Sequence, residues 1–152
     1  MGLRHLFTGQ QFRAIAAIFV AIAVVFAALS WYAIHIAPEA SGQAEIVLND
    51  FYRDCQENKY AEARRFVARD LRAQIDARDL AARWKKFAAS NGPMSRWIEA
   101  GGGKIRGGVK LWPRYVTFDT FVLGTRTERG RVLTRLVPED GGWRIDQFEI
   151  YP

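Results

Sequence analysis

Histidine and cysteine, the side chains that most often carry nucleophilic or metal chemistry, are scarce in this chain. The two histidines are His5 and His35, and the single cysteine is Cys55. A Ser-His-Asp triad and a Cys-His pair both need a histidine, and zinc sites rely on histidine or on several cysteines. No such arrangement can be built after His35. An internal disulfide is excluded as well, and we expect Cys55 to pack as a small apolar side chain, with intermolecular pairing as the alternative.

His35 stands at the end of an apolar stretch, close to Trp31 and Tyr32. An imidazole in this place is a candidate ligand for a haem or pigment held by neighbouring chains. A hydrated histidine at a membrane edge is the simpler interpretation, and we predict no cofactor.

A glycine-rich run, GGGKIRGG from Gly101 to Gly108, is similar in composition to a phosphate-binding loop. It lacks the GxxxxGK[ST] spacing, and no helical pattern follows it. The run instead predicts a hairpin or a glycine-rich bulge that displays Lys104 and Arg106.

Basic side chains are frequent between Arg53 and Lys86. Acids are interspersed among them, so a solvated and solubilising helical face is the simplest interpretation. The alternative is docking onto anionic headgroups or an acidic partner. The candidate contacts for such docking are Arg64, Arg65, Lys85 and Lys86, taken from the full set of Arg53, Lys59, Arg64, Arg65, Arg69, Arg72, Arg78, Arg83, Lys85 and Lys86.

The element that must position all these groups is an apolar stretch without charge, from Ala14 to Ile34. As a helix it would be about 31 Å long, close to the ~30 Å hydrocarbon core of a bilayer. We therefore predict a transmembrane helix over residues 14–37, with Pro38 as its end. Trp31 and Tyr32 suit the membrane interface, and small residues offer a contact face for another helix: Ala14, Ala17, Ala21 and Ala28.

The charges around the span predict its orientation. Arg4 and Arg13 precede it without an acid, whereas Glu39 and Glu45 are the first charges after it. The basic end of a span stays in the cytoplasm. Residues 1–13 should therefore form a cytoplasmic tail, and the remainder of the chain should lie outside the cytoplasm.

A cleaved signal peptide is the alternative to an anchor. Its apolar core is usually shorter, about 7 to 15 residues, and cuts after Ala37 or Ala40 would place Pro38 unfavourably. We expect an uncleaved anchor, a short linker over residues 38–43 and a domain over residues 44–152.

Length and charge limit the size of that domain and the kinds of partner it can have. Roughly 115 residues after the span suffice for one compact domain, and the chain of 152 residues has a net charge of +6. No recognised nucleic-acid motif accompanies this charge, and a domain outside the cytoplasm rarely meets nucleic acid. We expect lipid headgroups or an acidic protein face as partners, and no nucleic acid.

Hydrophobic periodicity predicts helices first and strands afterwards. Apolar residues at i, i+3, i+4 and i+7 favour helices from Ser41 to Asn58, from Tyr60 to Val67 and from Asp76 or Asp79 to Ser90. Runs rich in β-branched and aromatic residues then predict strands. These strands are expected near 94–100, 105–111, 114–125, 131–138 and 143–151, with turns at 101–103, 128–130 and 139–142, where EDGG supplies an Asp-Gly hairpin.

The third predicted strand is substantially apolar on both faces, because Val116, Phe118 and Val122 alternate with Tyr115, Phe121 and other large residues. One face should meet the helices, and the other should line a cavity or a partner surface. Helices followed by an antiparallel sheet predict an α+β class.

The ending VLTRLVPEDGGWRIDQFEI, from Val132 to Ile150, resembles the last strands of the nuclear-transport-factor-2-like superfamily, also called ketosteroid-isomerase-like or cystatin-like. The helical segment FYRDCQENKYAEA and the helix closed by SNGP occupy the matching places upstream. The resemblance implies a cone of about three helices packed on a curved antiparallel sheet. A span followed by such a domain also resembles the layout of small bacterial envelope proteins. The superfamily includes enzymes, ligand carriers and structural adaptors.

Isomerases of this superfamily use a cavity carboxylate as the base. Asp119 is the one carboxylate centred in a predicted strand, with Tyr115 on the same predicted face. It is therefore the candidate catalytic residue that the resemblance implies. A strand-edge or solvent-facing aspartate is the simpler interpretation of Asp119.

These observations together predict a non-enzymatic, single-span accessory or scaffold subunit of a bacterial inner-membrane complex, whether secretory, respiratory or photosynthetic. Its periplasmic domain would contact other subunits of the complex. A membrane-tethered binder of a small apolar ligand and an isomerase- or hydratase-like enzyme are the alternatives.

Overall fold

The computed structural model describes residues 9–99, 104–107, 113–126 and 129–151 of the chain. The chain divides into two compact units, Met1–Pro38 and Glu39–Pro152.

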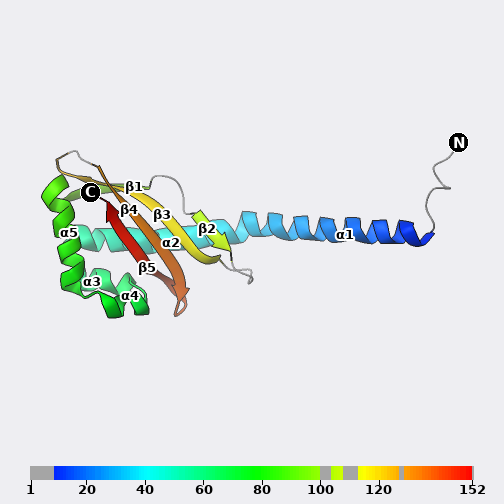
Figure 1. Cartoon of the computed structure of the whole chain (residues 1–152), viewed down its shortest axis with the longest axis horizontal. Helices are drawn as coiled ribbons and strands as arrows, with labels where there is room; N and C mark the ends of the chain where they lie inside the picture. Colours follow the sequence, from blue (N-terminus) through cyan, green and yellow to red (C-terminus); the bar gives the residue numbers. More distant parts are fainter. Residues whose placement is uncertain (1–8, 100–103, 108–112, 127–128, 152) are drawn as a thin grey trace. The chain divides into compact units, whose positions relative to one another are not determined.

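The first unit contains the helix α1, Gly9–Trp31, followed by a π-helical turn, Tyr32–Ile36 (Figure 1). Every side chain described from Arg13 to Trp31 is exposed, including Phe19 at 68% and Phe26 at 67%. A helix this long and this apolar is able to span a membrane, with a mean hydropathy of 2.6 over its most apolar window.

Pro38 does not end the helix, contrary to the prediction. The π-helical turn is followed directly by α2, Ala37–Gln56, which contains Pro38. Proline has no N–H, and its ring crowds the carbonyl four residues earlier, which here belongs to Ile34. The turn before Pro38 is wider than an α-helical turn, because the Ala37 N–H donates to the carbonyl of Tyr32, five residues back. Residues 38–43, predicted as a linker, are consequently helical.

The second unit continues with short helical segments: α3, Tyr60–Ala63; a 3₁₀ turn, Arg64–Phe66; α4, Arg69–Gln74; and α5, Ala77–Asn91. The chain turns between α2 and α3 at Asn58, whose φ is 60°. Asp76 starts α5 with a capping box, in which its side chain accepts from the N–H groups of Arg78 and Asp79. The sequence patterns predict neither α4 nor the break between α3 and the 3₁₀ turn.

Among the described residues, five antiparallel strands follow: β1, Met94–Glu99; β2, Lys104–Gly107; β3, Pro113–Gly124; β4, Arg129–Glu139; and β5, Gly142–Tyr151. Four of them are ordered β1-β3-β4-β5, and β2 pairs with β3 as well. The hairpin predicted from EDGG joins β4 to β5, and the positive φ of Asp140 and Gly141, 51° and 76°, fits a type I′ turn. The predicted turn at 101–103 and residue 128 of the next turn lie outside the described residues.

One face of the sheet is buried and the other is open. In β3 the side chains of Val116, Phe118, Thr120 and Val122 are buried, whereas those on the alternate positions are half-buried or exposed. Side chains of α2 contact the buried face: the Phe51 ring lies 5.9 Å from that of Phe148, between ring centroids. The α+β class predicted from the sequence is confirmed.

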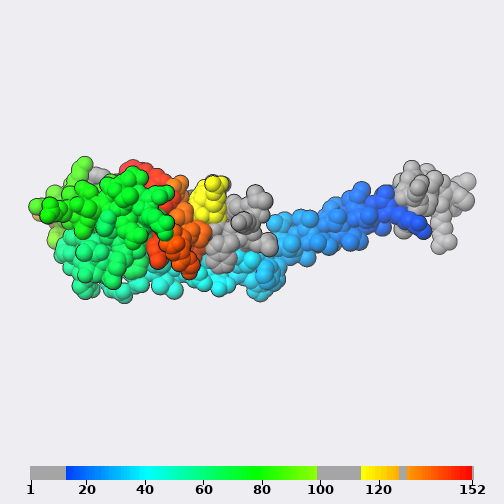
Figure 2. All heavy atoms as spheres, turned by 90° about the horizontal axis from the view of Figure 1, so that it is seen from below, coloured from blue at the N-terminus to red at the C-terminus, as the bar shows by residue number. Residues whose placement is uncertain are grey.

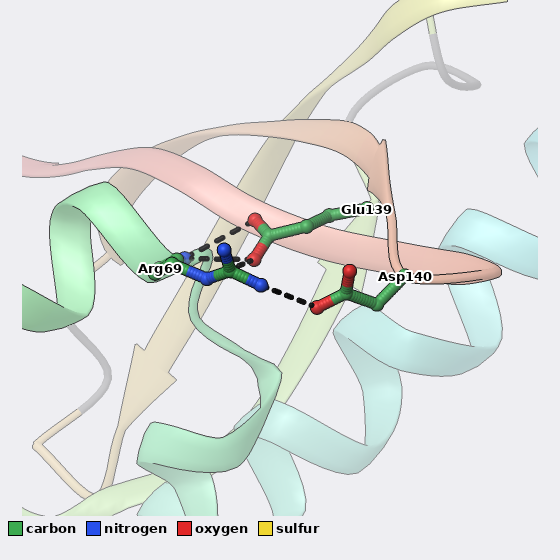
Figure 3. Close-up of polar contacts among 3 residues, drawn as sticks. All are labelled: Arg69, Glu139 and Asp140. Carbon is green, nitrogen blue, oxygen red and sulfur yellow. Dashed lines mark hydrogen bonds and ion pairs between the residues drawn. The ribbon is translucent and has the colours of Figure 1, made fainter.

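The short helix α4 is tied to the β4–β5 hairpin (Figure 3). The Arg69 backbone N–H, at the first residue of α4, donates to both carboxylate oxygens of Glu139, each at 3.1 Å. The Arg69 guanidinium also donates to Asp140, at 3.1 Å from Nη2 to Oδ2. Glu139 therefore supplies the cap that the sequence of α4 lacks, since its N-cap residue is Ala68.

Candidate functional site

Asp119, the candidate base, lies on the open face of the sheet with its carboxylate held by Arg131 of β4. Arg131 donates from Nε to Oδ1 at 2.8 Å and from Nη2 to Oδ2 at 2.6 Å. This is a two-point ion pair, in which both carboxylate oxygens already accept. The Asp119 side chain is on the face opposite Phe118 and Thr120, so it does not point into the space beneath the helices.

The open face carries a second pair of the same kind. Arg135 of β4 donates to Asp146 of β5, with Nη2 to Oδ2 at 2.6 Å, and its guanidinium lies 5.6 Å from the ring centroid of Tyr115. Exposed apolar side chains stand beside the pairs: Ile98 at 47%, Phe121 at 36% and Tyr151 at 45%. The sequence correctly places Tyr115 and Asp119 on one face.

Aromatic side chains contact one another in the buried core of the second unit. Tyr52 is fully buried, and its ring lies 6.1 Å from that of Trp84 and 5.7 Å from that of Trp97, between centroids. Its hydroxyl shares a hydrogen bond of 3.2 Å with the Thr134 hydroxyl. Burial raises the pKa of Tyr52 to about 12, so this phenol stays protonated at neutral pH.

Cys55 lies at the edge of this aromatic cluster and is 3% exposed. Burial raises the pKa of its thiol well above the ordinary value, because the interior disfavours the thiolate. The burial of Cys55 agrees with the prediction that it packs as a small apolar side chain, and the raised pKa favours the thiol over the reactive thiolate.

The raised pKa predicts how stability depends on pH. An unfolded thiol ionises near pH 8.5, whereas the buried thiol stays neutral at that pH. Ionisation of the unfolded chain therefore lowers the free energy of unfolding as the pH rises above about 8.5, and has little effect on it at lower pH. Between pH 7.5 and 9.5, we expect wild type to lose about 1 kcal/mol more of its unfolding free energy than Cys55→Ala. Urea titrations of both proteins at the two pH values measure this difference. Equal losses in the two proteins would contradict it.

The four basic residues proposed as contacts have different environments. The Arg64 guanidinium donates to the carbonyls of Ile75 at 3.0 Å and Arg72 at 2.6 Å, at the carboxyl end of α4. It therefore has a local structural role. Arg65 donates to the carbonyl of Glu62 at 3.3 Å. Lys85 and Lys86 are exposed on α5, where the sequence predicts them.

A small recess beside Lys86 was not predicted from the sequence. It has a volume of about 190 Å³ and is lined by Arg83, Lys86, Phe87 and Ile150. The Arg83 guanidinium lies 5.1 Å from the ring centroid of Phe148. Arg83 is present in the basic set, but only the fold brings it beside β5. We refer to this site as the α5–β5 recess.

In the first unit, the candidate contacts of α1 share one stripe of the helix, because Ala14, Ala17, Ala21 and Ala28 are separated by three, four and seven residues. All four are exposed. The Trp31 ring lies 5.6 Å from the His35 ring, and Tyr32 is half-buried beside them. His35 falls in the π-helical turn. Within the described residues no three acidic, histidine or cysteine side chains come together as a metal site.

No protein-family model, curated protein or solved structure matches this chain. What can be inferred about its role comes from its own residues.

Proposed function

We propose that this chain is a non-enzymatic, single-span accessory or scaffold subunit of a bacterial inner-membrane complex. Its helix α1 anchors it with the N-terminus in the cytoplasm, and the second unit contacts partner subunits in the periplasm. Arg13, before the apolar stretch, and Glu39 and Glu45, after it, support this orientation.

The observation that carries the proposal is one membrane-length apolar helix joined to a domain with an aromatic-filled interior. Phe51, Tyr52 and Phe118 are fully buried between the helices and the sheet. Enzymes and carriers of small molecules bind their ligands in concave, mostly apolar pockets with a few convergent polar groups. A packed interior leaves the surface as the part of this domain able to interact.

The same contacts support the finer prediction of a cone similar to the nuclear-transport-factor-2-like superfamily, with about three helices packed on a curved sheet. Aromatic side chains from α2 and α5 meet residues of β3, β4 and β5 in one core. In that superfamily adaptors share the cone with enzymes, so the resemblance is compatible with a scaffold.

Purification of the full-length chain from its native membrane in mild detergent tests the proposal. We expect other membrane subunits to co-purify in fixed proportion. A matched chain with leucine at Ala14, Ala17, Ala21 and Ala28 keeps the span apolar but removes its small-residue stripe, and we expect it to lose span-mediated partners. A chain recovered alone in several mild detergents, at full yield, would contradict the proposal.

A binder of a small apolar ligand is the second candidate. A surface recess of about 330 Å³ is lined by Cys55, Tyr60, Trp84, Met94 and neighbouring residues, and this volume suits a small molecule. Native mass spectrometry of the same purified sample separates the candidates: a stoichiometric small molecule supports the binder, and bound protein chains support the scaffold.

An isomerase- or hydratase-like enzyme is the third candidate, with Asp119 as its base. Its carboxylate is paired with Arg131 on the open face of the sheet. A base in that setting lacks the enclosed site that proton abstraction from carbon requires.

A further inference from the structure

The outer edge of β5 is an edge of the sheet in the second unit and carries backbone hydrogen-bonding groups. β5 is last in the order β1-β3-β4-β5, and it pairs with β4 on its inner side. An edge strand presents backbone N–H and C=O groups that another extended chain can pair with.

The first half of this edge is already paired with an extended segment of the same chain, at Val67 and Ala68. Val67 forms a parallel bridge with Ile145, and the Ala68 N–H donates to the Ile145 carbonyl at 2.7 Å. The pairing with β4 shifts just after this point, because Leu136 pairs with Ile145 but Arg135 pairs with Gln147, so Asp146 is an extra residue. In the part of the chain that the structure describes, Gln147–Tyr151 pairs only with β4.

Two cations flank this second half of the edge. Arg83 lies over the Phe148 ring at 5.1 Å, and Lys86 lines the α5–β5 recess with it. Neither makes an ion pair with another described residue. The recess has an apolar floor of Phe87 and Ile150. An anionic side chain with an apolar neighbour would match both the charge and the floor.

The opposite side of the edge has a different character. Glu149 accepts from Gln147 Nε2 at 2.9 Å and from the Tyr151 hydroxyl. Successive side chains of a strand point to opposite faces, so an added strand would alternate between the cations of α5 and the acid Glu149. Acids would be favoured at every second position and disfavoured between them.

From this geometry we propose that the free half of the β5 edge, Gln147–Tyr151, docks an acidic extended segment of a partner protein as an added strand. Backbone hydrogen bonds to β5 hold the segment, and carboxylates at alternate positions contact Arg83 and Lys86. The inference rests on the proposed function, because it names the kind of partner segment that a scaffold domain would bind. Figure 2 shows the orange β4–β5 hairpin at the surface next to green helical segments.

The test uses the full-length chain in mild detergent and a fluorescent heptapeptide that alternates glutamate and valine. We expect the peptide to bind and to protect the amides of Gln147–Tyr151 from hydrogen exchange. The charge reversal Arg83→Glu/Lys86→Glu should weaken binding about tenfold. The matched control Arg78→Glu/Lys85→Glu removes the same charge from another part of α5 and should bind like wild type.

A heptapeptide with the same side chains but with every backbone amide N-methylated separates strand addition from simple charge attraction, because it has no amide N–H to donate along either of its edges. We expect it not to bind. Equal binding of both peptides, equal weakening by both charge reversals, or no binding at all would overturn the inference. If the inference fails in this way but partner proteins still co-purify with the Arg83→Glu/Lys86→Glu chain, the proposed scaffold function is retained and only the docking of a strand on β5 is excluded.

Discussion

Phe51→Ala is expected to lower the unfolding free energy of the second unit by about 3–5 kcal/mol. The Phe51 side chain is 0% exposed, and its ring contacts those of Tyr52 and Phe148, with centroids 5.7 and 5.9 Å away. Truncation removes buried apolar surface and leaves a cavity between α2 and β5, which the surrounding aromatic rings cannot fill without leaving their rotamers.

The measurement is urea unfolding of the full-length chain in mild detergent, followed by near-ultraviolet circular dichroism. Ile46→Ala is the matched control, because Ile46 is also an apolar residue of α2 but is 64% exposed. We expect it to change stability by no more than about 0.5 kcal/mol. Similar losses for the two variants would show that α2 is not held by Phe51.

Gly124→Ala is expected to cost about 3 kcal/mol. A Cβ at this position would lie 1.8 Å from the backbone oxygen of Asn91 and 2.5 Å from its carbonyl carbon. These are backbone atoms at the end of α5, so the clash cannot be relieved by turning a side chain. The end of β3 and the end of α5 would have to separate.

Gly42→Ala is the control for this substitution. Gly42 lies in α2, and an added Cβ there meets no atom within 4 Å. Alanine favours the helix, so we expect this variant to gain about 0.5–1 kcal/mol. The same urea titration measures both variants, and a loss below about 1 kcal/mol for Gly124→Ala would contradict the close approach.

The sequence predicts most of the elements because their signals are local. The apolar stretch from Ala14, the amphipathic pattern around Phe51 and the Asp-Gly turn each depend on a few neighbouring residues. The prediction fails at Pro38, where the rule that proline ends a helix gives way to a π-helical turn. It also fails at α4, whose six residues carry no N-cap of their own.

The surfaces are less predictable than the elements. The sequence places Asp119 and Tyr115 on one face, because alternation along a strand is a local property. It cannot pair Asp119 with Arg131, which depends on the register between β3 and β4. The sequence predicts Arg64 as a partner contact, because it cannot show that the Arg64 guanidinium bonds to carbonyls at the carboxyl end of α4. The role proposed for Arg83 depends on its position beside β5, which only the folded chain shows.

The contact between Arg69 and Glu139 affects the order in which parts of the chain can fold. Six residues are too few for a stable helix in water, and the carboxylate that caps α4 stands 70 residues later in the chain. During synthesis α4 therefore cannot persist until the β4–β5 hairpin has emerged and folded back. We therefore expect proteases to cut this segment more readily in a chain shortened before Glu139, because α4 then lacks its cap.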